Sequence, residues 1–128
     1  MKSAAVIIPM YNHRYLIMLR SGSDPYFPLK WNFPGGGLEE GEDPKDGAVR
    51  ELVEESAIEA RKDDLEKVGI YYQDGIQIHL YRLRVDSPVV RCRDGEHQEY
   101  AWVPPHSLLH YELMPGTQKI LSEIKEQQ

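Results

Sequence analysis

Three glutamates, Glu51, Glu54 and Glu55, lie within five consecutive residues of a segment that we expect to be helical. At about 100° per residue, their side chains fall within an arc of about 100° on one helix face. The opposite face carries four apolar residues: Ala48, Val49, Leu52 and Val53. Carboxylates at this spacing repel each other by a few tenths of a kcal/mol, and a divalent cation with oxygen ligands reverses that interaction. The pattern therefore predicts a carboxylate site for Mg²⁺, with Mn²⁺ as a second possibility. The alternative is an acidic helix face that only contacts solvent.

The segment before this helix contains a glycine-rich turn. Gly35-Gly36-Gly37 follows a short apolar stretch and precedes an acidic loop that ends at Glu42. Glycines allow the backbone to approach a ligand closely, so a free carbonyl here could be a further metal ligand. On the helix, Arg50 lies four residues before Glu54 and can orient a carboxylate by a charge-assisted hydrogen bond.

Elements on both sides must position these residues. Asp43-Pro44 is a helix start, because Asp43 can cap and Pro44 suits the first helical position. We expect this helix to end at about Glu55 or Ser56, and a second helix from Pro115 to about Glu126 after a short one through Leu109. The expected strands are Ala4–Met10, Tyr15–Arg20, Trp31–Pro34, Leu65–Gln73, Ile76–Val85 and Tyr100–Val103. Pro9 suggests that the first strand is an edge or contains a bulge. The order indicates an α+β or α/β/α layered domain with a mixed sheet.

Together these residues resemble the Nudix box. That motif reads Gly, five residues, Glu, seven residues, Arg-Glu, an aliphatic residue, any residue, Glu-Glu, any residue, Gly and an aliphatic residue. Here Gly36 is followed by Glu42 at the required spacing, and Arg50 to Ile58 supply the rest. The resemblance implies a Nudix-type α/β/α sandwich with a mixed central β-sheet, formed by a single domain over residues 1–128.

The resemblance also implies roles for individual residues. The metal ligands would be Glu51, Glu54, Glu55 and the carbonyl of Gly35. Gly36, Gly37 and Glu42 would form the motif loop, which the Glu42–Arg50 pair braces. Glu51 is similar to the general base of some members, whereas others take the base from a later loop. In this chain that loop offers Glu96 as the first choice and Glu99 as the second.

One fixed position departs from the motif. Ala57 stands where the family has glycine. In a left-handed conformation, alanine costs on the order of 1 kcal/mol, unless the turn shifts. We expect an effect on stability and no loss of activity, because all the acids remain.

Residues near the motif are candidates for substrate binding. Arg20 ends a strand and could contact a phosphate. Asn32 could hydrogen-bond a base edge, and Trp31 could stack on it, although a tryptophan at this place is more often a core residue.

The reaction implied by the resemblance is hydrolysis of a diphosphate linkage. A water activated by the acids attacks one phosphorus in line, and the other phosphate leaves. We expect a (deoxy)nucleoside triphosphate or oxidised nucleotide as substrate, which gives the monophosphate and pyrophosphate. The alternatives are a nucleotide sugar or an ADP-ribose-type substrate, removal of pyrophosphate from RNA 5′ ends, and a catalytically silent nucleotide sensor.

Composition narrows the classes of partner. The formal net charge is −6, and lysines and arginines are scattered, so a nucleic-acid partner is not expected. A single cysteine, Cys92, excludes an intrachain disulfide and a cysteine-rich zinc site. The N-terminal apolar run is too short for a signal peptide, and no segment reaches the length of a membrane span. We expect a cytoplasmic, soluble monomer or homodimer.

Overall fold

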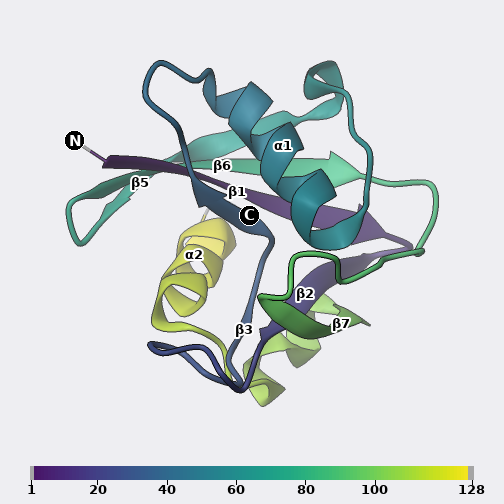
Figure 1. The fold of residues 1–128 in the computed structure, drawn as a ribbon. Coiled ribbons are helices and arrows are strands. Elements are labelled where there is room, and N and C mark those ends of the chain that lie inside the picture. Colours follow the sequence, from purple (N-terminus) through teal and green to yellow (C-terminus); the bar gives the residue numbers. More distant parts are fainter. Residues whose placement is uncertain (1, 127–128) are drawn as a thin grey trace.

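The computed structural model describes residues 2–126 as a layered α+β fold (Figure 1). The strands are β1 (Lys2–Tyr11), β2 (Arg14–Arg20), β3 (Trp31–Asn32), β4 (Gly35–Gly37), β5 (Glu66–Gln73), β6 (Ile76–Arg84) and β7 (His97–Val103). The helices are α1 (Pro44–Ser56) and α2 (Pro115–Glu126), with 3₁₀ turns at η1 (Lys62–Asp64) and η2 (Pro105–His110). This arrangement confirms the predicted fold class.

β1 is the centre of a mixed sheet. It pairs in parallel with β6 along nearly its whole length, and β6 pairs in turn with β5 across an antiparallel hairpin. On its other edge, β1 pairs antiparallel with β4 at Ala4–Val6 and with β2 at Met10–Tyr11. β2 also pairs with β3 and β7. β4 therefore lies directly beside the central strand, whereas β3 lies beside β2.

Pro9 lies within β1, and the expectation of an edge strand is wrong. The N–H of Ile7, two residues earlier, donates to the Pro34 carbonyl at 2.9 Å across the β4 and β2 edge. The nitrogen of Pro9 faces the same edge, because strand residues alternate direction with a period of two. This is the gap between the two antiparallel ladders, so the proline removes no ladder hydrogen bond.

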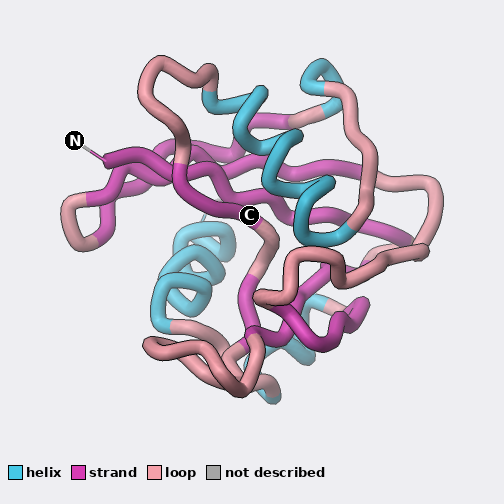
Figure 2. The backbone as a smooth tube through the Cα atoms, viewed as in Figure 1, coloured by secondary structure: helices cyan, strands magenta, loops and turns pink. Residues whose placement is uncertain are grey.

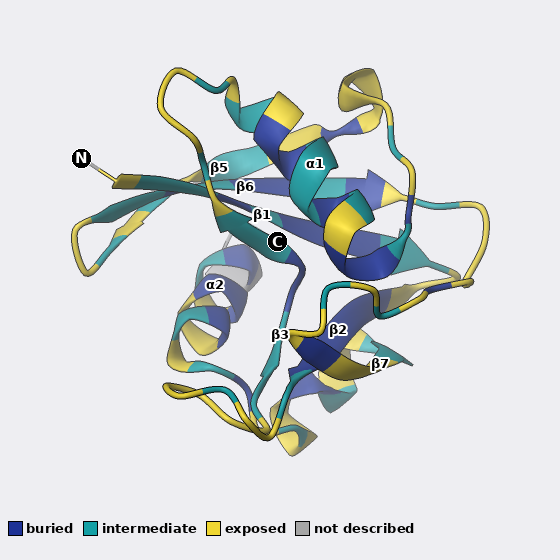
Figure 3. Cartoon of the chain, in the orientation of Figure 1, coloured by how far each residue is buried: buried dark blue, intermediate teal, exposed yellow. Residues whose placement is uncertain are grey.

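Each face of the sheet is covered by one helix (Figures 1 and 2). Leu52 and Ala48 of α1 pack on Ala5 and Ile7 of β1. On the opposite face, Ile120 and other apolar residues of α2 pack on a second core with Ile8, Ile17 and Leu80. The buried residues of Figure 3 follow these two layers. Because β1 contributes alternate residues to both cores, its register fixes both helices.

Most strand boundaries differ from the predictions by one or two residues, and two differences bear on the site. Gly35–Gly37, predicted as a turn, form β4, because pairing with β1 outweighs the low strand propensity of glycine. β7 begins at His97, three residues before the predicted start at Tyr100, since β2 extends the pairing to Arg20. No described helix is long and apolar enough to cross a membrane.

Candidate functional site

Helix α1 is fixed at both ends by its local sequence. Asp43 caps its start, where its side chain accepts from the N–H groups of Lys45 at 2.9 Å and Asp46 at 3.3 Å. The helix ends at Ser56, and the next residue, Ala57, caps it with φ 64° and donates its N–H to the Val53 carbonyl at 3.1 Å. Alanine therefore adopts the left-handed conformation that glycine would take there, and the turn does not shift. The helix bounds agree with the prediction.

The three glutamates of α1 differ sharply in exposure. The side chain of Glu54 is 53% exposed and that of Glu51 is 14% exposed, whereas Glu55 is only 3% exposed. The helical periodicity places all three on one face, but the segment after β6 and the glycine strand cover the end of that face. One acid is therefore open to solvent and one is enclosed.

Arg50 holds the motif loop against the helix. Its Nε and Nη2 donate to the two carboxylate oxygens of Glu42, at 2.9 and 3.0 Å. Its Nη1 donates to Glu51 at 2.9 Å, and Nη2 also donates to the carbonyl of Gly37 at 3.2 Å. The hydrogen bonds from Arg50, with that from the Glu39 N–H, lower the pKa of Glu42 to about 2. The guanidinium thus links the loop acid, the glycine strand and the helix in one contact set.

Strand β4 lies directly against the acids. The N–H of Gly35 donates to Glu55 Oε1 at 3.2 Å. A Cβ on Gly36 would lie 2.6 Å from the Glu51 carboxyl group, so only glycine fits there without displacing that acid. The carbonyl of Gly35 as a metal ligand stays a prediction.

The surroundings of Glu55 fit a divalent cation. Burial raises the pKa of Glu55 well above its usual range, the N–H of Gly35 opposes this, and the carboxylates of Glu51 and Asp94 raise it further. Among the described side chains, those of residues 2–124, no lysine or arginine forms an ion pair with Glu55. Buried carboxylates in this arrangement need a proton or a cation, and oxygen donors at this spacing suit a hard divalent ion.

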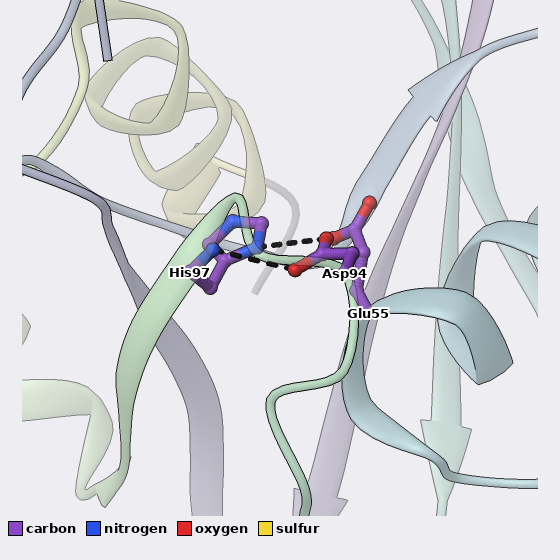
Figure 4. A group of neighbouring side chains, drawn as sticks. All are labelled: Glu55, Asp94 and His97. Atoms are coloured by element: carbon purple, nitrogen blue, oxygen red, sulfur yellow. Dashed lines mark hydrogen bonds and ion pairs between the residues drawn. The ribbon is translucent and has the colours of Figure 1, made fainter. Parts of the chain in front are cut away.

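Asp94 is an acid of the site that the sequence analysis missed. One ligand atom from each of Glu55, Asp94 and His97 lies within 4.8 Å of the others (Figure 4). Glu96 and Glu99, the predicted loop acids, are exposed. The Glu96 N–H donates to Asp94 Oδ1 at 3.0 Å, which turns Asp94 toward the helix. The Asp94-Gly95 pair was a signal for such a turn. A role for Glu96 or Glu99 stays a prediction.

A cavity of about 1040 Å³ lies beside the acids. Gly35 and Gly36 line it, so β4 forms a wall shared by the cavity and the acid site. Asn32 also lines this cavity, and its contact with a substrate stays a prediction. Its remaining walls near α2 include Val6, Phe33, Ile78, Met114, Thr117 and Ile120. The site therefore joins an apolar hollow with a few polar groups to a cluster of carboxylates.

The other two candidate substrate residues have protein partners. Trp31 packs edge-on against Tyr111, with ring centroids 5.2 Å apart, and its backbone pairs with the segment before α2. Arg20 forms an ion pair with Asp24 within the loop that follows β2. Neither lines the cavity in this structure, so substrate contact by either residue stays a prediction.

Comparison with known proteins identifies the family. The model of the NUDIX domain matches residues 1–124. The chain belongs to the NUDIX domain family. This assignment makes it a pyrophosphohydrolase of the group that uses a divalent metal ion, in agreement with the acids on α1.

Individual relatives resemble the chain over most of its length. It is 28% identical to nucleoside triphosphatase NudI of Escherichia coli O17:K52:H18, with 94% of this chain and 96% of the relative covered. A MutT structure from the study of Aliivibrio salmonicida and Vibrio cholerae superposes with a TM-score of 0.80 at 20% identity, covering 99% and 98% of the two chains. The NUDIX domain of Shewanella oneidensis NrtR, solved with ADP ribose, gives a TM-score of 0.80 at 16% identity, covering 98% and 86%. The two structures show the shared fold of the NUDIX family.

Proposed function

We propose that this chain hydrolyses a (deoxy)nucleoside triphosphate or oxidised nucleotide to the monophosphate and pyrophosphate. The observation that carries the proposal is the shared wall formed by Gly35 and Gly36, with carboxylates on one side and the cavity on the other. A nucleoside in the cavity would have its phosphates beside α1. The similarity to the nucleoside triphosphatase NudI over 94% of the chain supports this substrate class.

The residues of α1 would hold the metal at the phosphates. Glu51, Glu54 and Glu55 are the proposed ligands, and Mg²⁺ is the proposed ion, with Mn²⁺ as a substitute. When bound, the cation offsets the negative charge of the phosphate oxygens. Arg50 keeps the carboxylate of Glu51 in place through a 2.9 Å hydrogen bond. Glu51 or Asp94 would accept the proton of the attacking water.

The cavity would bind the base and the sugar. Its size is at the upper end of the usual range for small-molecule sites, about 300–1,000 Å³. Apolar side chains such as Phe33 and Met114 would contact the faces of the base, and the amide of Asn32 would hydrogen-bond its edge. This division of roles is usual in such pockets, where a few polar groups determine orientation.

An ADP-ribose-type substrate is the second candidate. It is favoured by the NrtR domain, which has the same fold and was solved with ADP ribose. A nucleotide sugar belongs to the same class. A silent nucleotide sensor is disfavoured, because all three helix acids are present.

The test is release of pyrophosphate and phosphate across a substrate panel with Mg²⁺, with Mn²⁺ and with chelator. The panel holds dNTPs, 8-oxo-dGTP, ADP-ribose, nucleotide sugars and dinucleoside polyphosphates. Glu54→Gln removes a proposed metal ligand and should lower kcat by about 10²-fold or more, since loss of even an outer partner of a ligand costs about 10- to 100-fold. Glu59→Gln, at an exposed glutamate beyond the helix, should not change kcat. Pyrophosphate release from triphosphates supports the first candidate. A preference for ADP-ribose or a nucleotide sugar supports the second, and folded protein with no turnover contradicts both.

A further inference from the structure

His97 contacts both halves of the site. Its side chain is only 2% exposed. Nδ1 lies 3.2 Å from Asp94 Oδ2, and Nε2 lies 3.3 Å from Asn32 Oδ1. A buried imidazole with a specific partner at each ring nitrogen has its orientation fixed by those partners, and it fixes them in return.

The contact at Nδ1 of His97 fixes the position of Asp94. Asp94 Oδ1 accepts from the N–H groups of Glu96 at 3.0 Å and His97 at 3.3 Å, so that oxygen is used by the turn. The other oxygen faces His97, and an ionised carboxylate only accepts, so Nδ1–H is the donor. Figure 4 shows Asp94 between His97 and Glu55. The imidazole thus holds Asp94 beside Glu55 although the two acids repel each other.

The contact at Nε2 of His97 orients Asn32, a residue that lines the cavity. Asn32 lies on β3, a two-residue strand, and its side chain has one end against His97 while the residue lines the cavity. An amide can face an imidazole with either its oxygen or its NH₂ group. In both cases one end of the amide is used by His97, and the other remains for a ligand.

We propose that His97 is a positioning residue that couples substrate recognition to the metal side of the site. Through Nδ1 it holds Asp94 against Glu55, and through Nε2 it orients the Asn32 amide toward the cavity. The inference rests on the proposed function for the nature of the ligand, but its two contacts are testable without turnover. His97 itself touches neither the substrate nor the metal in this role.

Two isosteric substitutions separate the contacts. In His97→Asn, the side-chain NH₂ lies near the position of Nδ1 and can still donate to Asp94, but it cannot reach Asn32. In His97→Gln, the amide end lies near the position of Nε2 and can still bind Asn32, but it leaves Asp94 without its donor. His97→Leu removes both contacts and keeps the site apolar.

The first readouts need no reaction. Mn²⁺ binding to the wild type and each variant is measured by electron paramagnetic resonance. His97→Gln should weaken Mn²⁺ binding about 10-fold or more, because Asp94, whose carboxylate lies beside the proposed ligand Glu55, loses the partner that holds it there. His97→Asn should change Mn²⁺ binding less than about 3-fold. The side-chain amide of Asn32 is followed by ¹⁵N relaxation. It should become mobile in His97→Asn and stay ordered in His97→Gln.

The second readouts use the preferred substrate of the panel. His97→Asn should raise KM about 10-fold with little change in kcat, and His97→Gln should lower kcat about 10-fold or more with little change in KM. Asn32→Leu should match the KM effect of His97→Asn. The double variant, Asn32→Leu with His97→Asn, should have a KM no higher than that of either single variant, because the two changes remove the same interaction.

Several outcomes would overturn the proposal. Equal effects of His97→Asn, His97→Gln and His97→Leu on every readout, in step with melting temperature, would show a packing role only. Loss of Mn²⁺ binding in both isosteres would show that His97 is itself a metal ligand. If the wild type binds Mn²⁺ but hydrolyses nothing, the proposed function fails, and the Mn²⁺ and Asn32 readouts still decide the role of His97.

Discussion

The backbone of Gly36 passes so close to Glu51 that a Cβ atom on Gly36 would lie 2.6 Å from the carboxyl group. The neighbouring residue, Gly37, has no atom within 4 Å of a corresponding Cβ. Both belong to β4, and both were expected as members of a glycine turn and of the motif loop. The structure therefore separates a glycine that is required by an acid of the site from one that is not.

We predict that Gly36→Ala lowers kcat by about 10²-fold, because a displacement of about 1 Å at a reacting group has an effect of that size. The added methyl group would lie 2.6 Å from the Glu51 carboxyl group, so it must displace that carboxylate. Gly37→Ala is the matched control, since its methyl group enters open space. Steady-state kinetics of the two variants checks this, and equal activity of both would contradict the proposed place of Glu51 in the site.

We predict that Arg50→Lys lowers kcat by about 10-fold or more and lowers the melting temperature. Lysine cannot reproduce the planar fork that binds both oxygens of Glu42 and also reaches Glu51. Arg61→Lys is the control, because Arg61 is exposed and forms no ion pair within the described residues. Kinetics and thermal unfolding are both measured. Unchanged kcat in Arg50→Lys would show that a positive charge, without the planar guanidinium, is enough to hold Glu42 and Glu51 in place.

Much of the site follows from sequence spacing, but burial does not. The periodicity of α1 and the cap at Asp43 predict the helix and the shared face of its acids. They give no information on what covers that face, so the enclosure of Glu55 was not predictable. It depends on Gly35 and on Asp94, which lie 20 residues before it and 39 residues after it. Contacts over such separations are set by the sheet pairings and not by local pattern.

The loop acid shows the same limit at a smaller scale. Asp94 and Glu96 are two residues apart, and composition alone gives no reason to prefer one. The choice is made by the turn at Asp94, which accepts the N–H of Glu96 and directs its own carboxyl inward. That turn is in register with the site because β7 starts at His97, where pairing with β2 begins. The late predicted start of β7 and the failure to predict Asp94 therefore have the same cause, which is the pairing of β7 with β2 up to His97.

We predict that Ala57→Gly stabilises the protein by about 0.5–1 kcal/mol. Ala57 has φ 64°, a left-handed conformation that costs alanine on the order of 1 kcal/mol. The greater freedom of glycine in the unfolded chain offsets part of this gain. Ala57→Val should be destabilising, because a branched side chain fits that conformation poorly. Urea unfolding measures the free energies, and a less stable Ala57→Gly protein would contradict the assigned backbone conformation.

Asp24, in the loop after β2, should titrate at unusually low pH. The N–H groups of Phe27 and Tyr26, together with Arg20, lower the pKa of Asp24 from 3.8 to about 2. A folded-state pKa below the unfolded value means that Asp24 contributes stability above about pH 3.8 and loses it as the pH falls through about 2. The difference in unfolding free energy between the wild type and Asp24→Asn should therefore be constant near neutral pH and shrink below pH 3.8. Carboxyl ¹³C NMR titration measures the pKa directly, with exposed Asp63 as the internal comparison. A midpoint for Asp24 near 3.8 would show that the loop contacts of Tyr26, Phe27 and Arg20 do not hold in solution.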